Sequence, residues 1–242
     1  MSNCIIAQSG GPTSVINSSV VGLLEANKTL GSFNKVFAGL NGIEGILNGN
    51  IIELSSISQE EINNFKYTPS SGLGSCRYKM KKLEESTEEY DKLLEILKAN
   101  DIKAFFYVGG NDSMDTTAKL SAYAKKTGID VKFIGIPKTI DNDLMYTDHT
   151  PGFGSAAKFI ATSVLETYLD SSVYINNGIF ILETMGRDTG WLASAAALAK
   201  LNGKQVADFI YLPETAFDID KFLVDVKNKF EEQNQVYIVV SE

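Results

Sequence analysis

The chain has 242 residues, of which 44% are hydrophobic and 21% charged, and its formal net charge is −8. Length and composition indicate a globular protein of one large or two moderate domains. The acidic balance disfavours general nucleic-acid binding. Two cysteines and one histidine exclude a disulfide framework and a site of several histidines. No apolar run reaches the ~18 residues of a membrane span and no basic signal region begins the chain, so we expect a cytoplasmic protein with no membrane and no nucleic-acid partner.

The first half of the chain predicts strands that alternate with helices. Short apolar runs bounded by turn residues predict strands over residues 3–7, 35–40, 51–54 and 104–108. Helical spacing and capping residues predict helices over residues 15–26 and 79–99, a helix that begins at Ser58, and one from about 114 to 126. The strand over 104–108 has no polar face, which is typical of a parallel sheet covered on both sides.

The second half continues the same alternation. Strands are predicted over residues 131–136, 178–182, 209–212 and 236–240, and helices over residues 153–168, 191–201 and 219–230. Strands and helices at this spacing indicate βαβ units. We therefore expect an α/β fold with doubly wound, mostly parallel sheets.

Polar or glycine-rich sequences follow four of the predicted strands, at the ends where open α/β sheets bind ligands. These sequences are residues 9–11, 109–113, 138–143 and 185–187. The first two are suited to cradle a phosphate, because glycines admit an oxyanion close to the backbone and the next helix offers its N–H groups. Taken alone, a sequence of this kind is more often a tight turn between a strand and a helix.

The third sequence is more specific, because it places a lysine and two carboxylates within six residues after an apolar strand. Asp141 and Asp143 can serve as a base and a metal ligand, and Lys138 supplies a cation. Transfer of a phosphoryl group needs a base for the attacking hydroxyl, Mg²⁺ on the phosphates and cations for the spreading charge. The alternative is a solvated turn, which such residues favour.

Several short motifs resemble those of phosphofructokinases, occur in that family's order and span nearly all of the chain. No single one is specific, but together they are. The matching stretches are Gln8-Ser9-Gly10-Gly11-Pro12 with Asn17, Gly74-Ser75-Cys76-Arg77, Gly109-Gly110-Asn111-Asp112-Ser113, Pro137-Lys138-Thr139-Ile140-Asp141-Asn142-Asp143, Thr147-Asp148 with Gly152-Phe153, Met185-Gly186-Arg187 and Pro213-Glu214. The resemblance implies a glycolytic enzyme that phosphorylates fructose 6-phosphate at its C1 hydroxyl.

The resemblance also implies which residues bind the phosphoryl donor. They are Gly11, Arg77, Asn111, Asp112, Ser113 and Lys138. Gly11 matches the glycine of the phosphate loop, and Arg77 matches an arginine that faces the transferred phosphate. Asn111 stands where many members have an aspartate near the metal, and its amide oxygen offers Mg²⁺ a ligand of less charge.

For the sugar phosphate, the resemblance implies a second set of residues. They are Thr139, Asp141, Asp143, Met185, Gly186, Arg187 and Glu214. Asp141 matches the catalytic base, with Lys138 and Arg187 as further catalytic residues, and Glu214 matches a carboxylate that holds a sugar hydroxyl. The implied cofactor is Mg²⁺, with Asn111 and Asp143 as its ligands.

Two positions favour pyrophosphate over ATP as the donor. Members that use ATP usually have glycine at the positions of Asp112 and Lys138, whereas members that use pyrophosphate resemble this chain. A carboxylate at Asp112 would repel the α-phosphate of ATP by ~1 kcal/mol in water and ~4 kcal/mol at an effective dielectric constant of 20. The predicted reaction is therefore reversible, Mg²⁺-dependent transfer from pyrophosphate, and an ATP-dependent enzyme is the alternative.

The resemblance further implies two domains. Residues 1–137 would bind the donor, and residues 138–242 would form a second α/β domain, incomplete in this chain, that binds the sugar phosphate. Because the family normally continues beyond the last residue present here, we expect the fragment alone to be weakly active or inactive. A silent fragment that binds phosphorylated ligands is a further alternative, and a homo-oligomer is expected for the longer protein.

Overall fold

The structure is a computed structural model that describes residues 1–175 and 177–242. The chain divides into two units, Met1–Lys138 and Thr139–Glu242. They are named unit 1 and unit 2 below, and each has its own sheet.

Unit 1 contains a five-stranded sheet in the order β3-β2-β1-β4-β5. Its strands are β1 (Asn3–Gln8), β2 (Val36–Gly39), β3 (Ile51–Glu53), β4 (Ile102–Gly109) and β5 (Lys132–Pro137). All neighbours pair in parallel except β2 and β3, which are antiparallel. The central strands β1 and β4 therefore end at the same edge, where an open α/β sheet binds its ligands.

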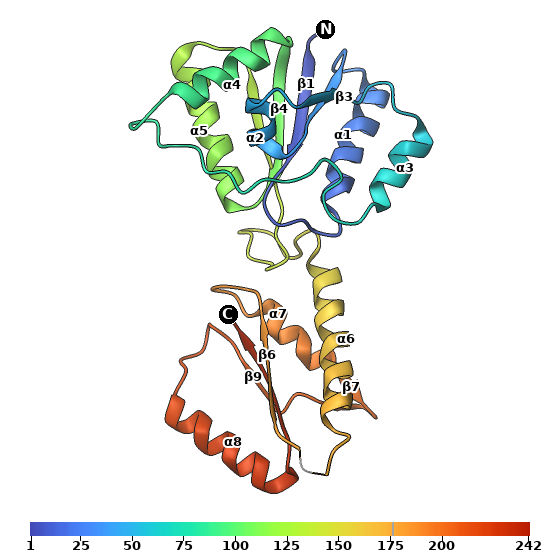
Figure 1. Cartoon of the computed structure of the whole chain (residues 1–242), viewed down its shortest axis with the longest axis vertical. Helices are drawn as coiled ribbons and strands as arrows, with labels where there is room; N and C mark the ends of the chain where they lie inside the picture. The colour runs from blue at the N-terminus through green and yellow to red at the C-terminus, as the bar shows by residue number, and fades with distance from the viewer. Residues whose placement is uncertain (176) are drawn as a thin grey trace. The chain divides into compact units, whose positions relative to one another are not determined.

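Five helices cover both faces of this sheet. They are α1 (Ile16–Leu30), α2 (Gly42–Leu47), α3 (Gln59–Tyr67), α4 (Glu88–Ala99) and α5 (Asn111–Thr127). One core contains residues of α2, α4 and α5, and the other contains residues of α1 and α3. Figure 1 shows α4 and α5 on one side of the strands and α1 and α3 on the other.

Alternation along the central strands explains why both faces are apolar. On β1, Ile5 contributes to the core under α4 and α5, while Ile6 contributes to the core under α1. On β4, Phe105 and Phe106 divide in the same way. A strand that buries both of its faces needs an apolar residue at almost every position.

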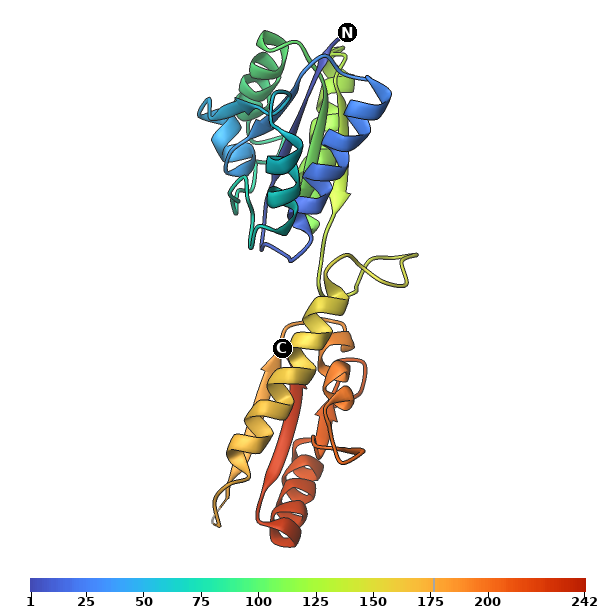
Figure 2. The ribbon, with the colours of Figure 1, turned by 90° about the vertical axis from the view of Figure 1, so that its right-hand side faces the viewer.

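Unit 2 contains a three-stranded parallel sheet in the order β6-β10-β9. Its strands are β6 (Ile179–Thr184), β9 (Phe209–Tyr211) and β10 (Val236–Ser241), and a separate hairpin joins β7 (Lys200–Leu201) to β8 (Lys204–Gln205). Its helices are α6 (Phe153–Ser171), α7 (Trp191–Ser194), the short 3₁₀ turn Ala195–Leu198 and α8 (Ile219–Gln233). The long helix α6 runs alongside the strands of this unit (Figure 2).

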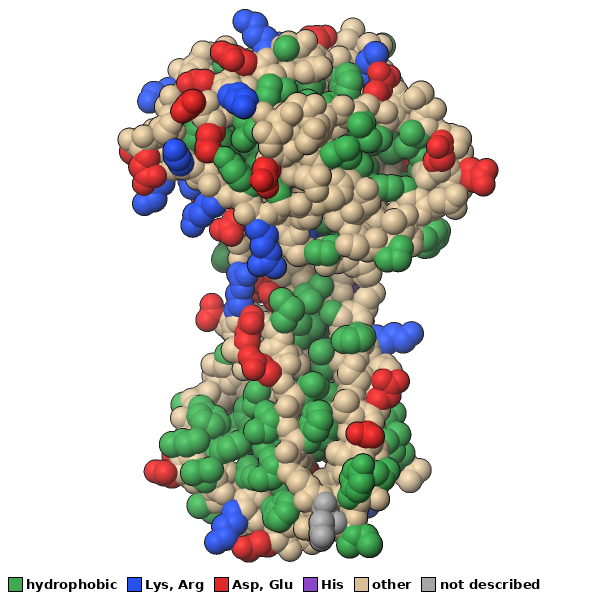
Figure 3. Space-filling view, viewed as in Figure 1, with side chains coloured by type: hydrophobic (Ala, Val, Ile, Leu, Met, Phe, Trp, Pro, Cys, Tyr) green, Lys and Arg blue, Asp and Glu red, His purple; other side chains and the backbone are tan. Residues whose placement is uncertain are grey.

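The two faces of this sheet are covered unequally. Residues of α6 pack on one face and residues of α8 on the other. On β6, however, Ile179 and Ile181 stay 53% and 55% exposed, and Leu223 of α8 is 57% exposed. Apolar side chains are correspondingly prominent on the visible surface of unit 2 (Figure 3).

The predicted fold class is confirmed, because both units are α/β and their sheets are mostly parallel. The cap at Ser58 is confirmed as well, since its hydroxyl accepts from the N–H of Glu61 at 3.2 Å while the Glu61 carboxylate accepts from the N–H of Ser58. Along the described residues, no helix has both the length and the apolar character that a membrane crossing needs.

The helix predicted over residues 79–99 is too long, because α4 begins only at Glu88. The preceding segment contains an isolated turn, in which the N–H groups of Glu85 and Ser86 donate to the carbonyl of Lys82, and side chains of α4 hold it. Tyr90 donates its hydroxyl hydrogen to the carbonyl of Lys81 at 2.8 Å, and the Glu89 carboxylate accepts from the N–H of Lys81. The charged pattern predicts one helix because periodicity does not report these contacts, which link residues eight to nine positions apart.

The helix predicted over residues 191–201 is also wrong in its second half. It gives way to a 3₁₀ turn and then to the β7–β8 hairpin. Asn202 and Gly203 both have positive φ, 51° and 80°, and an Asn-Gly pair is a strong signal for a two-residue hairpin turn. The short helix α2 has no counterpart among the predicted elements.

Candidate functional site

The loop after β1 is tied to the loop after β4 by two serines. Ser9 Oγ lies 2.6 Å from Ser113 Oγ and donates to the carbonyl of Val108 at 3.1 Å. A Cβ at Gly109 would lie 2.4 Å from Ser9 Oγ and 2.2 Å from Ser113 Oγ, which is too close for any side chain. Ser113 was predicted to bind the donor, but it is buried and joins the two loops.

Lys138 is the buried cation of unit 1. Its side chain is 8% exposed, and its Nζ lies 3.3 Å from the position that a Cβ on Gly10 would take. Its N–H donates to the carbonyl of Gly109 at 2.9 Å. Gly11 is exposed, and a Cβ there would meet nothing within 4 Å. The structure therefore brings a lysine ammonium group to an open glycine loop, an arrangement that suits a small anion.

Helix α5 begins beside this loop. Gly110 is its N-cap residue and offers no side chain to cap the first turn, in which Asp112 is the acidic residue. The N-terminus of a helix attracts anions through its N–H groups and its dipole. Asn111 and Asp112 are both exposed there, so their side chains are accessible to a ligand that approaches the helix end.

The two residues that precede Arg77 are hydrogen-bonded to Gly10 of the same loop. Gly10 donates its N–H to the carbonyl of Cys76 at 2.9 Å, and the Ser75 hydroxyl donates to the carbonyl of Gly10. Arg77 follows directly and is exposed. Its backbone is therefore fixed beside Gly10 while its guanidinium group remains accessible to solvent.

In unit 2, the turn that contains Asp141 and Asp143 is folded and largely buried. Asp141 and Asn142 are 9% and 6% exposed. The Asn142 side chain accepts from the N–H of Thr150 at 2.8 Å and donates to the carbonyl of Asp148. A solvated turn, the alternative left open by the sequence, does not describe this segment. One oxygen each of Asp141 and Asp143 is buried without a hydrogen-bond partner.

Burial dominates the electrostatics of Asp141. It raises the pKa of this carboxyl group above its usual value, and the charges of Asp143 and Glu242 raise that pKa further. The nearby charge of Arg187 and a hydrogen bond with Thr139 lower it, but the net direction is upward. A carboxylate whose pKa is moved toward neutrality is better matched to accept a proton during a reaction.

The turn after β6 lies close to the Asp141 turn. The Thr189 hydroxyl lies 3.1 Å from the carbonyl of Asp141 and 3.0 Å from the carbonyl of Gly186. Gly186 has φ 149°, and a Cβ on it would lie 2.4 Å from the carbonyl oxygen of Thr189. Only glycine fits there, and the backbone of the next residue, Arg187, has φ 53°.

A carboxylate approaches this turn from β10. Glu242 Oε1 accepts from the N–H of Gly186 at 3.4 Å and from the N–H of Arg187 at 3.2 Å. Two adjacent backbone N–H groups that face one oxygen form an anion-binding nest. Glu242 is not among the predicted site residues, although its place after a predicted parallel strand indicates that it lies at the ligand-binding edge.

Glu214, predicted to hold a sugar hydroxyl, is placed at the start of α7. Its carboxylate accepts from the N–H of Gly190 at 2.8 Å, so it caps that short helix. Met185 is 57% exposed at the neighbouring turn.

A divalent cation would find a partial site in unit 2. Among the described residues, no group of three or more His, Cys, Asp or Glu side chains could hold a metal ion. The unpartnered buried oxygens of Asp141 and Asp143 nevertheless suit a hard cation. Mg²⁺ is commonly bound by one or two carboxylates together with substrate phosphates and water, so these residues fit an ion that arrives with a phosphate.

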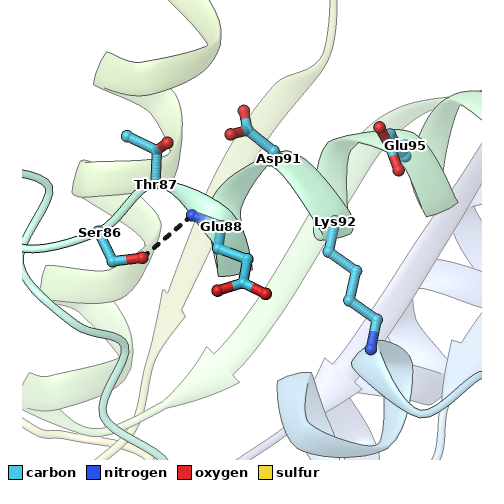
Figure 4. Close-up of a pocket in the computed structure, with 6 residues that line it drawn as sticks. All are labelled: Ser86, Thr87, Glu88, Asp91, Lys92 and Glu95. Atoms are coloured by element: carbon cyan, nitrogen blue, oxygen red, sulfur yellow. Dashed lines mark hydrogen bonds between the residues drawn. The ribbon is translucent and has the colours of Figure 1, made fainter.

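A shallow pocket at the start of α4 lies outside these groups (Figure 4). Its volume is about 490 Å³, and it is lined by Ser86, Thr87, Glu88, Asp91, Lys92 and Glu95. The Ser86 hydroxyl accepts from the N–H of Glu88 at 3.3 Å. Three carboxylates against one ammonium group make this pocket unfavourable for an anion.

The comparisons with known proteins agree on one family. The family model described as Phosphofructokinase matches residues 3–242. A pyrophosphate--fructose 6-phosphate 1-phosphotransferase from Methylococcus capsulatus is 45% identical over 99% of this chain, and the match covers 58% of that relative. An ATP-dependent 6-phosphofructokinase 2 from Clostridium perfringens is 32% identical over 87% of this chain and is covered over 52% of its length.

A solved structure is similar over the whole chain. The pyrophosphate-dependent phosphofructokinase from Nitrosospira multiformis has a TM-score of 0.87 and 42% sequence identity, and the similarity covers 100% of this chain and 60% of that one. The chain thus spans somewhat more than half the length of the relatives that it matches.

Proposed function

Because this chain belongs to the phosphofructokinase family, we propose that it takes part in phosphoryl transfer from pyrophosphate to the C1 hydroxyl of fructose 6-phosphate. Asp141 carries the proposal. It is a buried carboxylate with an unpartnered oxygen and a raised pKa, and it lies beside the glycine turn that presents Arg187.

In the proposed reaction, the Asp141 carboxylate accepts the proton of the C1 hydroxyl. The C1 oxygen then forms a bond to one phosphorus atom of pyrophosphate, the bridging P–O bond breaks, and orthophosphate leaves. The products are fructose 1,6-bisphosphate and orthophosphate, and the reverse reaction uses the same groups. Positioning and charge stabilisation supply most of the catalysis in such transfers.

The donor is bound by groups of unit 1 in this proposal. Lys138 and the glycine loop suit a compact dianion or trianion, because the buried ammonium group lies beside an open backbone. Asp112 at the start of α5 opposes the further phosphate of a nucleotide by like-charge repulsion. The 45% identity with a pyrophosphate-dependent relative supports the same donor.

The sugar phosphate is bound by groups of unit 2. Arg187 supplies a cation, and the Gly186 and Arg187 N–H groups already hold an anionic oxygen, that of Glu242. Glu214 stays a prediction as a sugar ligand, and its observed contact with Gly190 supports a structural role.

We assign Mg²⁺ as the cofactor, with Asp143 as a ligand. When bound, the ion would neutralise charge on the phosphate oxygens. The unpartnered buried oxygen of Asp143 supports this assignment. Asn111 as a ligand, self-association and a cytoplasmic location stay predictions of the sequence.

Binding and turnover together test the proposal. We would measure the affinity of the protein for pyrophosphate, ATP and fructose 6-phosphate by calorimetry in Mg²⁺, and follow fructose 1,6-bisphosphate formation with each donor. We expect pyrophosphate and fructose 6-phosphate to bind, and the weak turnover expected of this chain to occur with pyrophosphate and not with ATP.

The other outcomes separate the alternatives. Turnover with ATP alone would contradict the donor assignment. Binding of both proposed substrates without turnover would favour a silent phospho-ligand-binding fragment, and binding of neither would overturn the proposal.

A further inference from the structure

Two buried amide side chains of unit 1 form a closed hydrogen-bond network. Gln8, the last residue of β1, is fully buried. Its Nε2 donates to the carbonyl of Ile16 at 3.1 Å and to Asn17 Oδ1 at 2.9 Å. Its Oε1 accepts from the N–H of Leu73 at 3.0 Å and lies 2.7 Å from the Ser71 hydroxyl. Every donor and acceptor of this amide is therefore used.

Asn17, in the first turn of α1, is satisfied just as fully. It is 1% exposed. Its Oδ1 accepts from Gln8 and from the N–H of Gly72 at 2.8 Å, and its Nδ2 donates to the carbonyls of Thr68 and Ser70 at 2.8 and 3.1 Å. We call Gln8 and Asn17 together the amide clamp.

The amide clamp binds a segment that has no regular structure of its own. Between α3 and α4 the chain runs from Thr68 to Thr87 without a helix or strand. Ser70 has φ 64°, a conformation that is costly for a residue other than glycine. Such a segment keeps a single conformation only when other groups satisfy its backbone.

The far end of the clamped segment meets the donor loop. The carbonyl of Cys76 accepts from the N–H of Gly10, and the Ser75 hydroxyl donates to the carbonyl of Gly10. Arg77 is the next residue. The amide clamp thus holds one end of the segment whose other end places Arg77 beside Gly10 and Gly11.

We propose that Gln8 and Asn17 are positioning residues for the phosphoryl donor, acting through the segment Thr68–Arg77. This inference rests on the proposed function of the donor loop. The clamp sets the distance between the Arg77 guanidinium group and the anion held by the glycine loop, and it touches neither the donor nor the sugar phosphate.

Calorimetry on the intact 242-residue chain tests this role. For Asn17→Ala we expect the Kd for Mg²⁺-pyrophosphate to rise about tenfold, as for the loss of one or two net hydrogen bonds. The Kd for fructose 6-phosphate should stay within about twofold, because the amide clamp holds a segment of unit 1 and the proposed ligands of the sugar phosphate belong to unit 2. If Asn17→Ala only caused part of the protein to misfold, the measured number of binding sites would fall and the Kd of the folded protein would stay unchanged.

Asn27→Ala is the matched control. Asn27 lies on the same helix, and its side chain clamps another loop by accepting from the N–H of Phe33 at 2.8 Å and donating to its carbonyl at 3.1 Å. This change should lower the melting temperature without altering the Kd for pyrophosphate. Ser75→Ala is a milder variant for the case that Asn17→Ala fails to fold, and we expect it to raise the Kd about threefold.

A double-mutant cycle with Arg77 decides whether the clamp acts through that residue. Arg77→Met should weaken pyrophosphate binding about tenfold in the wild-type chain and less than about threefold in the Asn17→Ala chain, because coupled residues are not additive. Additive losses, or equal losses for Asn17→Ala and Asn27→Ala, would overturn the inference.

Anion binding by the wild-type chain tests the proposed function separately from the role of the clamp. If that chain binds ATP and not pyrophosphate, the donor assignment is wrong, and the same ratios of Kd measured with ATP decide the role of the clamp. A wild-type chain that binds neither anion overturns both proposals.

Discussion

The two units differ in how their polar site groups are satisfied. In unit 1, Ser9, Ser113, Gln8 and Asn17 are all buried and hydrogen-bonded. Among the described residues, the buried side-chain oxygens without a partner belong mostly to unit 2, where they include Asp141 and Asp143, and only that of Thr13 belongs to unit 1.

This difference indicates that the two units have different roles. A loop whose polar groups already have partners keeps its shape without a ligand, so the anion site proposed for unit 1 would be preformed. Buried carboxylate oxygens without partners cost free energy until a proton, a cation or a donor satisfies them. In unit 2 this cost falls on the carboxylates that we propose as the catalytic base and the metal ligand, an arrangement often found at functional sites.

The largest expected effect is that of Asp141→Asn on turnover. Loss of a general base lowers the rate by about 10²–10⁴-fold, so fructose 1,6-bisphosphate formation should fall by that factor. Asp148→Asn is the control, since Asp148 lies exposed in the same loop. A fall of less than about threefold in turnover for Asp141→Asn would show that Asp141 is not the base.

Lys138→Met tests the preformed anion site of unit 1. Removing a cation that is hydrogen-bonded to an anion costs about 1.5–3 kcal/mol, so pyrophosphate affinity should fall about tenfold to a hundredfold. Lys132→Met changes an exposed lysine at the start of β5, the strand that Lys138 directly follows, and should have no effect on calorimetric affinity. Equal behaviour of the two variants would contradict the donor role of Lys138.

Gly10→Ala separates backbone strain from damage to the anion site. Gly10 has φ +72°, and a Cβ there would lie 3.3 Å from Lys138 Nζ. Alanine in a left-handed conformation costs about 1–2 kcal/mol of unfolding free energy. Gly49→Ala has the same strain, with φ +80° and open space around a Cβ, so both variants should lose stability in urea while only Gly10→Ala weakens pyrophosphate binding.

The smallest expected effect is that of Asp141→Asn on the pH dependence of the unfolding free energy. Burial raises the pKa of Asp141 above its ordinary value, so the folded state holds this proton to higher pH than the unfolded state does. The stability that results is full below the pKa of the unfolded state and is lost as the pH rises through the folded pKa. Relative to wild type, Asp141→Asn should therefore gain unfolding free energy between acid and neutral pH. A constant difference across that range would contradict the raised pKa.

The parts of the fold that local pattern controls were predictable from sequence. β4 shows why: a run without a polar face, followed by glycines, is compatible with little else than a buried parallel strand. The turn of Asp141 and Asp143 is also singled out by the sequence, because it follows the end of a predicted strand, and the structure shows Asp141 buried there. The extent of α4 was not predictable, since Glu89 and Tyr90 hold the chain before it through contacts that propensity does not report.

The sequence predicts which strand ends carry the candidate site residues. It does not predict the hydrogen bonds that those residues make with one another and with their neighbours. Ser113 is a predicted donor ligand, and the structure adds its contact with Ser9 at 2.6 Å. Glu214 is a predicted sugar ligand, and the structure adds its contact with the N–H of Gly190. Both ligand roles stay predictions, whereas the two contacts depend on which neighbour the fold brings within hydrogen-bond distance.

The sequence by itself determined the order of the strands and helices apart from α2 and the β7–β8 hairpin, the family, and the strand-end loops that carry the candidate chemistry. These follow from periodicity and from short motifs, which are local properties of the chain. Only the tertiary structure decided that Gln8 and Asn17 hold the segment of Arg77, and that Glu242 faces the turn of Gly186. Both contacts join residues more than fifty positions apart, and their geometry exists only once the sheets have formed and the helices have packed on them.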